Sequence, residues 1–164
     1  GDCIKIKTNK RSYSSKILIG ADGANSLVRK QARLDCPKDI LFGLQTTAKG
    51  KFNSESVELW FGSDIAPNFF AWVVPEDGNI ARIGLATDSN PMKFYNSFLK
   101  KRLGYTTRPD TGGIIRYGLM KESSADRVML VGDAACQVKP FSGDGLVYGM
   151  NQSKISYDPD KKAL

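Results

Sequence analysis

Hydrophobic and polar residues alternate at the start of the chain in the pattern of a half-exposed strand. Residues 3–8 alternate, with the isoleucines at 4 and 6 on one face and the lysines at 5 and 7 on the other. A polar turn at 9–12 and a second short strand at 13–15 complete a predicted β-hairpin. An apolar strand at 16–19 follows and leads into a turn of glycine and other small residues at 20–26.

An order of apolar strand, small-residue turn and helix occurs twice along the chain. After the first turn a short helix begins at Leu27, with Asn25 or Ser26 as its N-cap residue. Near the end, the four apolar residues at 128–131 predict a strand buried on both faces, and a glycine-rich stretch leads to a helix beginning at Leu146. Such a segment presents unpaired backbone N–H groups and a positive helix end, which suit a pyrophosphate or the pyrimidine ring of a reduced flavin.

A run of four strands is predicted between these two segments. The strands lie at 40–47, 56–61, 68–74 and 79–87, and glycine, asparagine, aspartate and proline residues separate them. The stretch Glu-Asp-Gly-Asn at 76–79 is typical of a hairpin turn. Consecutive strands at this spacing predict an antiparallel sheet.

An amphipathic helix is predicted after the sheet, over Pro91–Leu103. Proline stands near its first position, Lys100, Lys101 and Arg102 stand in its last turn, and Gly104 stops it. Compensation of the helix dipole explains the basic end more simply than contact with a membrane does.

Composition and charge describe an ordinary globular domain. The chain has 164 residues, of which 41% are hydrophobic and 25% are charged, and no apolar run approaches the roughly 18 residues that span a bilayer. The net charge of +7 is spread along the chain and favours anionic partners. No nucleic-acid-binding motif accompanies this charge, so it indicates solubility and no nucleic-acid partner.

Histidine is absent, and the three cysteines are Cys3, Cys36 and Cys136. Their odd number and wide spacing fit neither a zinc site nor a disulfide framework, so we expect no metal and a reducing, cytoplasmic setting. The lack of histidine also removes the commonest proton shuttle, and the sequence assigns no catalytic residue. A tyrosine, Cys136, water or a residue elsewhere in a longer protein remain alternative proton donors.

Both strand–turn–helix segments resemble motifs of FAD-dependent oxidoreductases with the para-hydroxybenzoate-hydroxylase-like fold. Gly-Asp-Ala-Ala at 132–135, followed by Lys-Pro-x-x-Gly-x-Gly at 139–145, resembles the second flavin-binding motif and is most similar to that of the geranylgeranyl reductase family. Gly-Ala-Asp-Gly-x-x-Ser-x-x-Arg at 20–29 resembles the Asp-Gly motif of the same group. Each segment alone is also compatible with an ordinary strand and a capped helix, with Arg29 in solvent.

The resemblance implies FAD as the cofactor. Asp133 would hold the ribitol, the backbone at 143–145 would face the flavin ring, and Asp22, Gly23 and Arg29 would support the pyrophosphate. The full set of implied cofactor-binding residues is Asp22, Gly23, Arg29, Gly132, Asp133, Ala134, Pro140, Gly143, Asp144 and Gly145.

Phe70, Trp72 and Val74 fall on one face of a predicted strand by its period of two. The residues alone leave two alternatives, the wall of a cavity for a long apolar chain or the core beneath the sheet. The pattern Pro-x-x-aromatic-x-Trp-x-apolar-Pro at 67–75 resembles the segment that borders the isoprenoid pocket in geranylgeranyl reductases. The resemblance therefore implies that these three side chains bind substrate.

The resemblance implies an α/β (α+β) fold, a partial Rossmann-like FAD-binding domain with an inserted antiparallel sheet. The expected domains are 1–35 and 125–164 for FAD and 36–124 for substrate. The implied protein resembles digeranylgeranylglycerophospholipid reductases, which saturate isoprenoid double bonds of membrane lipids with electrons from NADPH or ferredoxin. It would be cytoplasmic, and peripheral contact with the membrane surface is left open.

Three departures from the family leave other functions open. No Gly-x-Gly-x-x-Gly motif precedes residue 16, so we expect a fragment of a longer protein, and a fragment silent in catalysis and without FAD is one alternative. Cys136 stands where the family commonly has glycine, and a small buried substitute is favoured over a reactive thiol. The chain becomes polar after Met150, so the last helix is expected to fray. A monooxygenase or halogenase of the same fold is the other alternative.

Overall fold

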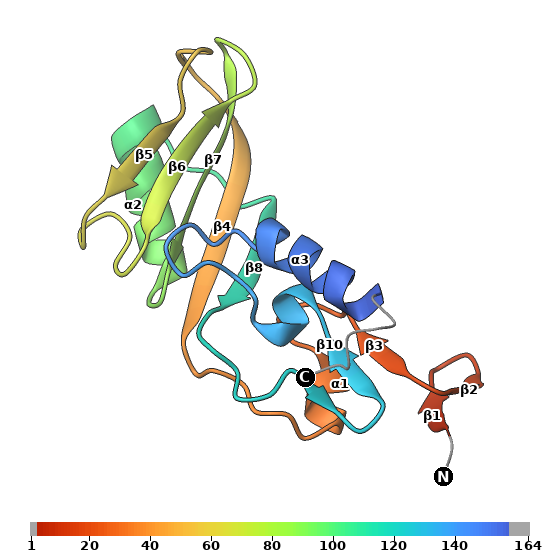
Figure 1. The fold of residues 1–164 in the computed structure, drawn as a ribbon. Helices are drawn as coiled ribbons and strands as arrows, with labels where there is room; N and C mark the ends of the chain where they lie inside the picture. Colours follow the sequence, from red (N-terminus) through yellow and green to blue (C-terminus); the bar gives the residue numbers. More distant parts are fainter. Residues whose placement is uncertain (1–2, 158–164) are drawn as a thin grey trace. The chain divides into compact units, whose positions relative to one another are not determined.

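The structure is a computed structural model that describes residues 3–157, and the chain forms two compact units (Figure 1). Unit 1 combines residues 1–39 and 116–164, and unit 2 comprises residues 40–115. Unit 1 contains β1 (Ile4–Lys7), β2 (Ser12–Ser15), β3 (Leu18–Gly20), α1 (Leu27–Gln31), β9 (Ser124–Ala125), β10 (Val128–Leu130), the 3₁₀ helix η1 (Gly132–Ala135) and α3 (Leu146–Tyr157). Unit 2 contains β4 (Ile40–Lys49), β5 (Glu58–Phe61), β6 (Phe70–Pro75), β7 (Ile80–Thr87), α2 (Pro91–Leu103) and β8, which runs from Thr111 to Arg116 across the boundary.

Unit 1 is built on a small sheet in the order β3-β10-β9. Strand β10 pairs in parallel with β3, with Val128 opposite Leu18 and Leu130 opposite Gly20, and β9 joins β10 in the antiparallel sense. The preceding hairpin of β1 and β2 forms as predicted, with Ile4 opposite Ser15. The chain contains both a parallel pair of strands that are far apart in sequence and an antiparallel sheet, which confirms the predicted α/β class.

Strand β10 is less buried than the sequence predicts. Only Leu130 is fully buried, whereas Val128 and Met129 are half-buried. The reason is that one side of this narrow sheet borders a hollow of about 680 Å³, whose walls include Leu18, Val28 and Val128.

The helix α3 corrects the expectation of a frayed tail after Met150, because it continues to Tyr157. Local polarity did not stop it, since no proline or glycine interrupts residues 151–157. The proline-containing segment from Asp158 onward, predicted to end the helix, lies outside the described residues.

Unit 2 is an antiparallel sheet in the order β5-β6-β7-β4-β8, with α2 lying along one face (Figure 1). The four predicted strands correspond to β4–β7. Small and branched residues of the sheet pack against three large side chains of α2. The core cluster includes Ala48, Ala71, Val73, Ala81, Ile83, Leu85, Tyr95, Phe98 and Leu99.

Helix α2 has the bounds that the sequence predicts. Proline occupies its first turn, and Gly104 ends it in the left-handed conformation with φ of 81°, where its N–H donates to the carbonyl of Lys100. The fifth strand, β8, was not predicted, because Gly112 and Gly113 give it low strand propensity. Pairing with β4 compensates for this deficit.

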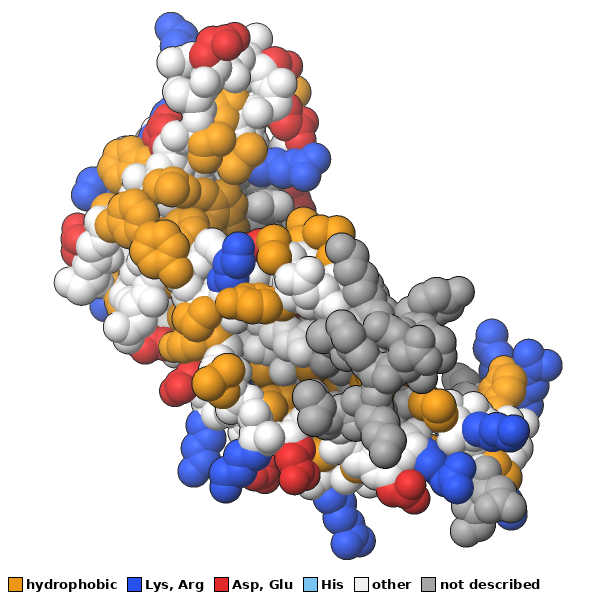
Figure 2. Space-filling model, viewed as in Figure 1, with side chains coloured by type: hydrophobic (Ala, Val, Ile, Leu, Met, Phe, Trp, Pro, Cys, Tyr) orange, Lys and Arg blue, Asp and Glu red, His pale blue; other side chains and the backbone are white. Residues whose placement is uncertain are grey.

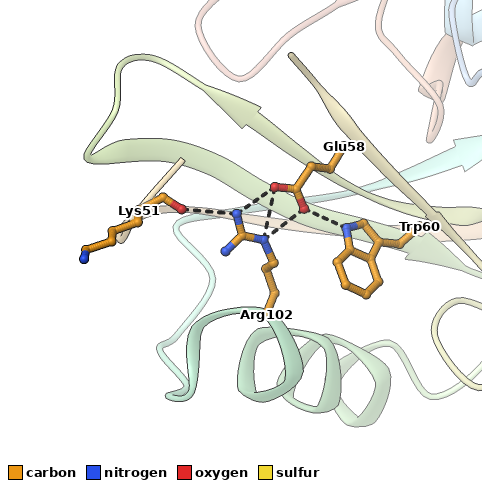
Figure 3. Close-up of polar contacts among 4 residues, drawn as sticks. All are labelled: Lys51, Glu58, Trp60 and Arg102. Carbon is orange, nitrogen blue, oxygen red and sulfur yellow. Dashed lines mark hydrogen bonds and ion pairs between the residues drawn. The ribbon is translucent and has the colours of Figure 1, made fainter. Parts of the chain in front are cut away.

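Glu58 ties the edge strand β5 to α2 (Figure 3). Its carboxylate accepts hydrogen bonds from Nε and Nη2 of Arg102, the shorter at 2.6 Å, and from the indole N–H of Trp60 at 2.9 Å. The side chains of Glu58 and Arg102 are only 30% and 20% exposed. The hydrogen bonds from Arg102 lower the pKa of Glu58 below its usual value despite its partial burial, which opposes the ionised form.

We expect Glu58→Gln to lower the free energy of unfolding by about 1 to 2 kcal/mol at pH 7, because a neutral amide loses the charge-assisted hydrogen bonds. A carboxyl with a lowered pKa stabilises the fold fully above its unfolded-state pKa and progressively less as the pH falls through the folded-state pKa. The difference between wild type and variant in urea unfolding should therefore shrink below about pH 4.

Glu76→Gln is the matched control, since the ion pair of Glu76 with Arg82 is exposed. Its loss should be below about 0.5 kcal/mol. Equal losses in the two variants would contradict the structural role of Glu58.

Candidate functional site

The two glycine-containing turns of unit 1 follow neighbouring strands and lie at the same edge of the sheet. Strands β3 and β10 run in parallel, and the N–H of Val131 donates to the carbonyl of Gly20 at 3.0 Å. The segment with Asp22 therefore leaves the sheet beside the segment with Asp133. This edge, at the carboxyl ends of parallel strands, is where α/β folds bind ligands.

Gly20 allows this close approach of α1 to the sheet. A Cβ atom there would lie 2.7 Å from Leu130 and 2.9 Å from Val28. These two side chains occupy the space beside the glycine, so a larger residue would force α1 away from β10.

Arg29 joins the two turns from inside the protein. Its side chain is only 2% exposed, which excludes the alternative that it lies in solvent. Nη1 donates to the carbonyl of Ala134 at 2.7 Å, and Nη2 donates to the carbonyl of Ala24 at 2.7 Å. One guanidinium thus holds a backbone group of the first turn and a backbone group of the second.

Asp22 is bonded to the start of α1. Its carboxylate accepts hydrogen bonds from the hydroxyl of Ser26 and from the N–H groups of Leu27, at 2.7 Å, and Val28, at 3.1 Å. Burial favours the neutral acid, but these hydrogen bonds outweigh it and lower the pKa of Asp22. Ser26 also caps α1 as predicted, accepting from the N–H of Arg29. Support of a pyrophosphate by Asp22, Gly23 and Arg29 stays a prediction, and in this structure the polar groups of Asp22 and Arg29 bond within the protein.

The second turn leaves one carboxylate uncommitted. Residues 132–135 form η1, in which Gly132 has φ of 60° and Ala134 is buried. Asp133 is exposed, and no hydrogen bond or ion pair occupies its carboxylate within residues 3–157. Asp133 borders a hollow of about 610 Å³ together with residues of the 143–150 segment.

The glycine-rich segment passes close to this carboxylate. A Cβ atom at Gly145 would lie 3.2 Å from Oδ1 of Asp133 and 3.3 Å from the carbonyl of Gln137, so only glycine fits without displacing them. Gly143 has φ of 69°, in the region that favours glycine. Asp144 starts α3 by accepting from the N–H of Leu146 at 2.9 Å and pairs with Lys139 at 3.7 Å.

A second, smaller hollow of about 340 Å³ adjoins the end of the turn at Ala135 and Cys136. Pro140, Cys136, Gln137, Val138 and Tyr148 border it with residues 118–123. The amide oxygen of Gln137 is buried there without a hydrogen-bond partner among the described residues. Of the predicted cofactor-binding residues, the structure therefore places Gly143, Asp144 and Gly145 around Asp133, places Pro140 at the smaller hollow, and uses Asp22 and Arg29 to hold the turns.

In unit 2, Phe70, Trp72 and Val74 lie on the face of the sheet opposite α2. Their neighbours Ala71 and Val73 are fully buried in the core, so the alternative that the three residues fill that core is wrong. Strand register places Leu59 beside Trp72 and Phe61 beside Phe70. Figure 2 shows the resulting hydrophobic patch over β5 and β6, where Leu59 and Phe61 are more than half exposed.

Two residues that the sequence did not single out shape this aromatic face. Gln45 accepts the indole N–H of Trp72 at 2.9 Å, so the ring carries no unsatisfied donor. A Cβ atom at Gly84 would lie 2.7 Å from the Trp72 ring and 2.5 Å from the carbonyl of Leu44, so glycine lets the indole lie flat on β7. A hollow of about 260 Å³ adjoins Trp72 and Gln45. Only the strand register reveals these partners, because they are distant in sequence.

No family model matches the chain, but individual relatives do. Digeranylgeranylglycerophospholipid reductase 2 of Methanococcoides burtonii is 32% identical over 180 residues, which cover 98% of this chain and 43% of that protein. Digeranylgeranylglycerophospholipid reductase of Methanosarcina mazei is 30% identical, covering 92% of this chain and 40% of that protein. The chain belongs to the geranylgeranyl reductase family. It spans about two fifths of the length of these relatives.

Solved structures share the fold of this geranylgeranyl reductase family member. A geranylgeranyl bacteriochlorophyll reductase-like protein from Thermoplasma acidophilum has a TM-score of 0.74 at 21% identity, covering 93% of this chain and 43% of that one. The flavin-dependent halogenase CmlS has a TM-score of 0.64 at 20% identity, covering 94% of this chain and 32% of that one. These likenesses confirm the predicted fold of FAD-dependent oxidoreductases.

Two further features of this family member concern metals and membranes. Among residues 3–157, no three or more histidine, cysteine, aspartate or glutamate side chains are grouped as metal ligands. In the same part of the chain, no helix has the length and apolar character that crossing a bilayer requires.

We expect Arg29→Met to lower the free energy of unfolding of this chain by about 2 kcal/mol, because the buried carbonyl of Ala134 loses its hydrogen bond from Arg29, whereas the carbonyl of Ala24 keeps one from Arg116. Lys30→Met is the matched control, since Lys30 is exposed on the same helix. Urea unfolding followed by circular dichroism measures both. A loss in the Arg29 variant no larger than in the Lys30 variant would show that the bridge between the turns contributes nothing.

Proposed function

We propose that the chain forms part of an FAD-dependent reductase that saturates isoprenoid, geranylgeranyl-type double bonds in membrane lipid biosynthesis. The observation that carries the proposal is the bridge by Arg29, which fixes two distant turns so that an uncommitted carboxylate, Asp133, adjoins a glycine cradle. Relatives named digeranylgeranylglycerophospholipid reductase support the substrate class. The relatives are longer, so the activity proposed is that of the whole protein.

The residues around Asp133 fit a flavin. Its free carboxylate can accept hydrogen bonds from ribitol hydroxyls, and the half-buried backbone at 143–145 can approach the ring closely because Gly145 carries no side chain. Gly132 and Ala134 belong to the turn that carries Asp133, and Pro140 stands between this turn and Gly143. Reduced FAD, when bound, would supply the hydride for saturation of the double bond.

Toward FAD, the role of Arg29 and Asp22 is to position the turn that carries the carboxylate of Asp133. Arg29 holds the carbonyl of Ala134, the residue after Asp133, and so limits where the carboxylate can lie. Asp22 orients α1, from which Arg29 projects. Because the carboxylate of Asp22 is negative, direct contact with a phosphate would be repulsive unless a cation lay between them. We therefore assign Asp22, Gly23 and Arg29 an indirect part in holding the pyrophosphate.

The outer face of the unit 2 sheet fits an isoprenoid chain. Phe70, Trp72 and Val74 offer apolar and aromatic surface beside Leu59 and Phe61, and Gln45 satisfies the single indole donor. A polyprenyl chain has no polar groups to pair, so it loses no hydrogen bond on such a surface. Exposed apolar patches of this kind mark binding surfaces.

Among the described residues, the structure supports no side chain as the proton donor. Burial, and then the neighbouring thiol of Cys36, raise the pKa of Cys136 to about 11, so this thiol gives up its proton poorly near neutral pH.

Electrons would come from NADPH or ferredoxin, and the protein would work in the cytoplasm, in peripheral contact with the membrane that holds its lipid.

We expect Asp133→Asn to weaken the binding of FAD by about tenfold, because the amide loses a charge-assisted hydrogen bond. Quenching of flavin fluorescence during titration of the protein measures the dissociation constant. Asp126→Asn is the matched control, since the side chain of Asp126 is 95% exposed. Unchanged binding by the Asp133 variant would contradict the assigned ribitol contact.

The reaction itself is tested with the wild-type chain, dithionite-reduced FAD and a geranylgeranyl ether phospholipid. A product that gains two hydrogen atoms per double bond supports the reductase. A product that gains oxygen in air would identify a monooxygenase instead. Retention of FAD with no change in the lipid would contradict catalysis by this chain.

A further inference from the structure

Two cysteines that are a hundred positions apart meet in unit 1. Cys36 follows α1, and Cys136 closes the η1 turn in the left-handed conformation with φ of 54°. Pro37, next to Cys36, lies against Gly118, which borders the same hollow as Cys136, and the thiol of Cys36 helps to raise the pKa of Cys136. Because the two cysteines are so far apart in the chain, the sequence alone did not predict that they are neighbours.

Backbone packing brings the segment that follows Cys36 against residues 117 and 118. The N–H of Tyr117 donates to the carbonyl of Asp39 at 3.4 Å, and a Cβ atom at Gly118 would lie 3.0 Å from Pro37. Gly118 and Cys136 border the same hollow of about 340 Å³. The segment after α1 therefore lies against residues 117 and 118, of which Gly118 borders the same hollow as Cys136. This packing does not involve the thiol groups.

The two thiols differ in their access to solvent. Cys36 is half-buried and so can meet a small oxidant, whereas Cys136 is only 3% exposed. Nη1 of Arg29 lies 3.8 Å from Sγ of Cys136, where its positive charge partly offsets the burial that raises the pKa of this thiol. A partly accessible thiol near a shielded one is the arrangement of an oxidisable cysteine and its resolving partner.

We propose that Cys36 and Cys136 form a reversible disulfide that responds to hydroperoxides. The thiolate of Cys36 attacks one oxygen of hydrogen peroxide, the O–O bond breaks, and a sulfenic acid and water result. The sulfur of Cys136 then displaces hydroxide from the sulfenic acid, and its proton joins that hydroxide as a second water. Two thiols thus lose two electrons and two protons to one peroxide, and a thiol reductant reverses the step.

The disulfide would tie the segment after α1 to the turn that carries Asp133. The N–H of Cys136 donates to the carbonyl of Asp133 at 3.1 Å, so a covalent bond at Cys136 restrains that turn directly. A bond closing so long a loop also removes freedom from the unfolded chain, and the apparent melting temperature should rise. Formation of the bond does not depend on the proposed binding of FAD.

The test is to treat the full chain with hydrogen peroxide, then block free thiols and measure intact mass and tryptic peptides without reductant. We expect the mass to fall by two hydrogen atoms before blocking, one cysteine to remain alkylated, and a linked pair of peptides containing Cys36 and Cys136. Dithiothreitol should restore both free thiols and the original melting temperature.

Cys36→Ser should abolish the linked peptides while keeping the fold, because the side chain is half-exposed, and Cys3→Ser should leave them unchanged. Cys136→Ser provides a second variant on the buried side. Alkylation of all three cysteines after peroxide, stepwise addition of oxygen at Cys36 without a linked peptide, or a link to Cys3 would each overturn the proposal.

Discussion

The buried guanidinium of Arg29 is the interaction on which unit 1 depends. A cation with 2% exposure is tolerated in a protein only when its donors are paired, and here backbone carbonyls of Ala24 and Ala134 pair them. Parallel pairing of β3 with β10 brings the turns to one edge, and the guanidinium then fixes one turn against the other. Lysine could not do the same, because a single ammonium lacks the planar fork that reaches two carbonyls at once.

Unit 2 separates stability from recognition by using the two faces of one sheet. On the α2 side, small and branched residues such as Ala71 and Val73 leave room for the large rings of the helix. On the other side, aromatic residues remain accessible to solvent. Gly84 leaves room for the indole ring of Trp72 against β7, and Gln45 accepts the hydrogen bond of its N–H group. This apolar surface, which the core does not need, is the one proposed to bind a lipid, and its exposure costs the unit part of the hydrophobic stabilisation it would gain by burial.

Local signals in the sequence predicted most elements, and the contacts between distant segments could not be predicted. Proline and glycine fix both ends of α2, and alternation located β4–β7, because these signals act within a few residues. The strand β8 has glycines where strand formers are expected, so only its pairing reveals it. Arg29 matched a motif, but a motif does not show that its donors bond to Ala134, a residue more than a hundred positions away. The contact of Cys36 with Cys136 was hidden for the same reason.

The central claim is that β3, β10 and the two turns form one cooperative unit held by Arg29. Native-state hydrogen exchange at two amides tests it most directly, because Leu18 donates to Arg127 and Val131 donates to Gly20 across the same pair of strands. The account predicts that both amides are protected to a similar degree and that Arg29→Met lowers the protection of both together. Rapid exchange at Val131 in the wild-type chain, or a loss of protection at only one amide in the variant, would contradict it.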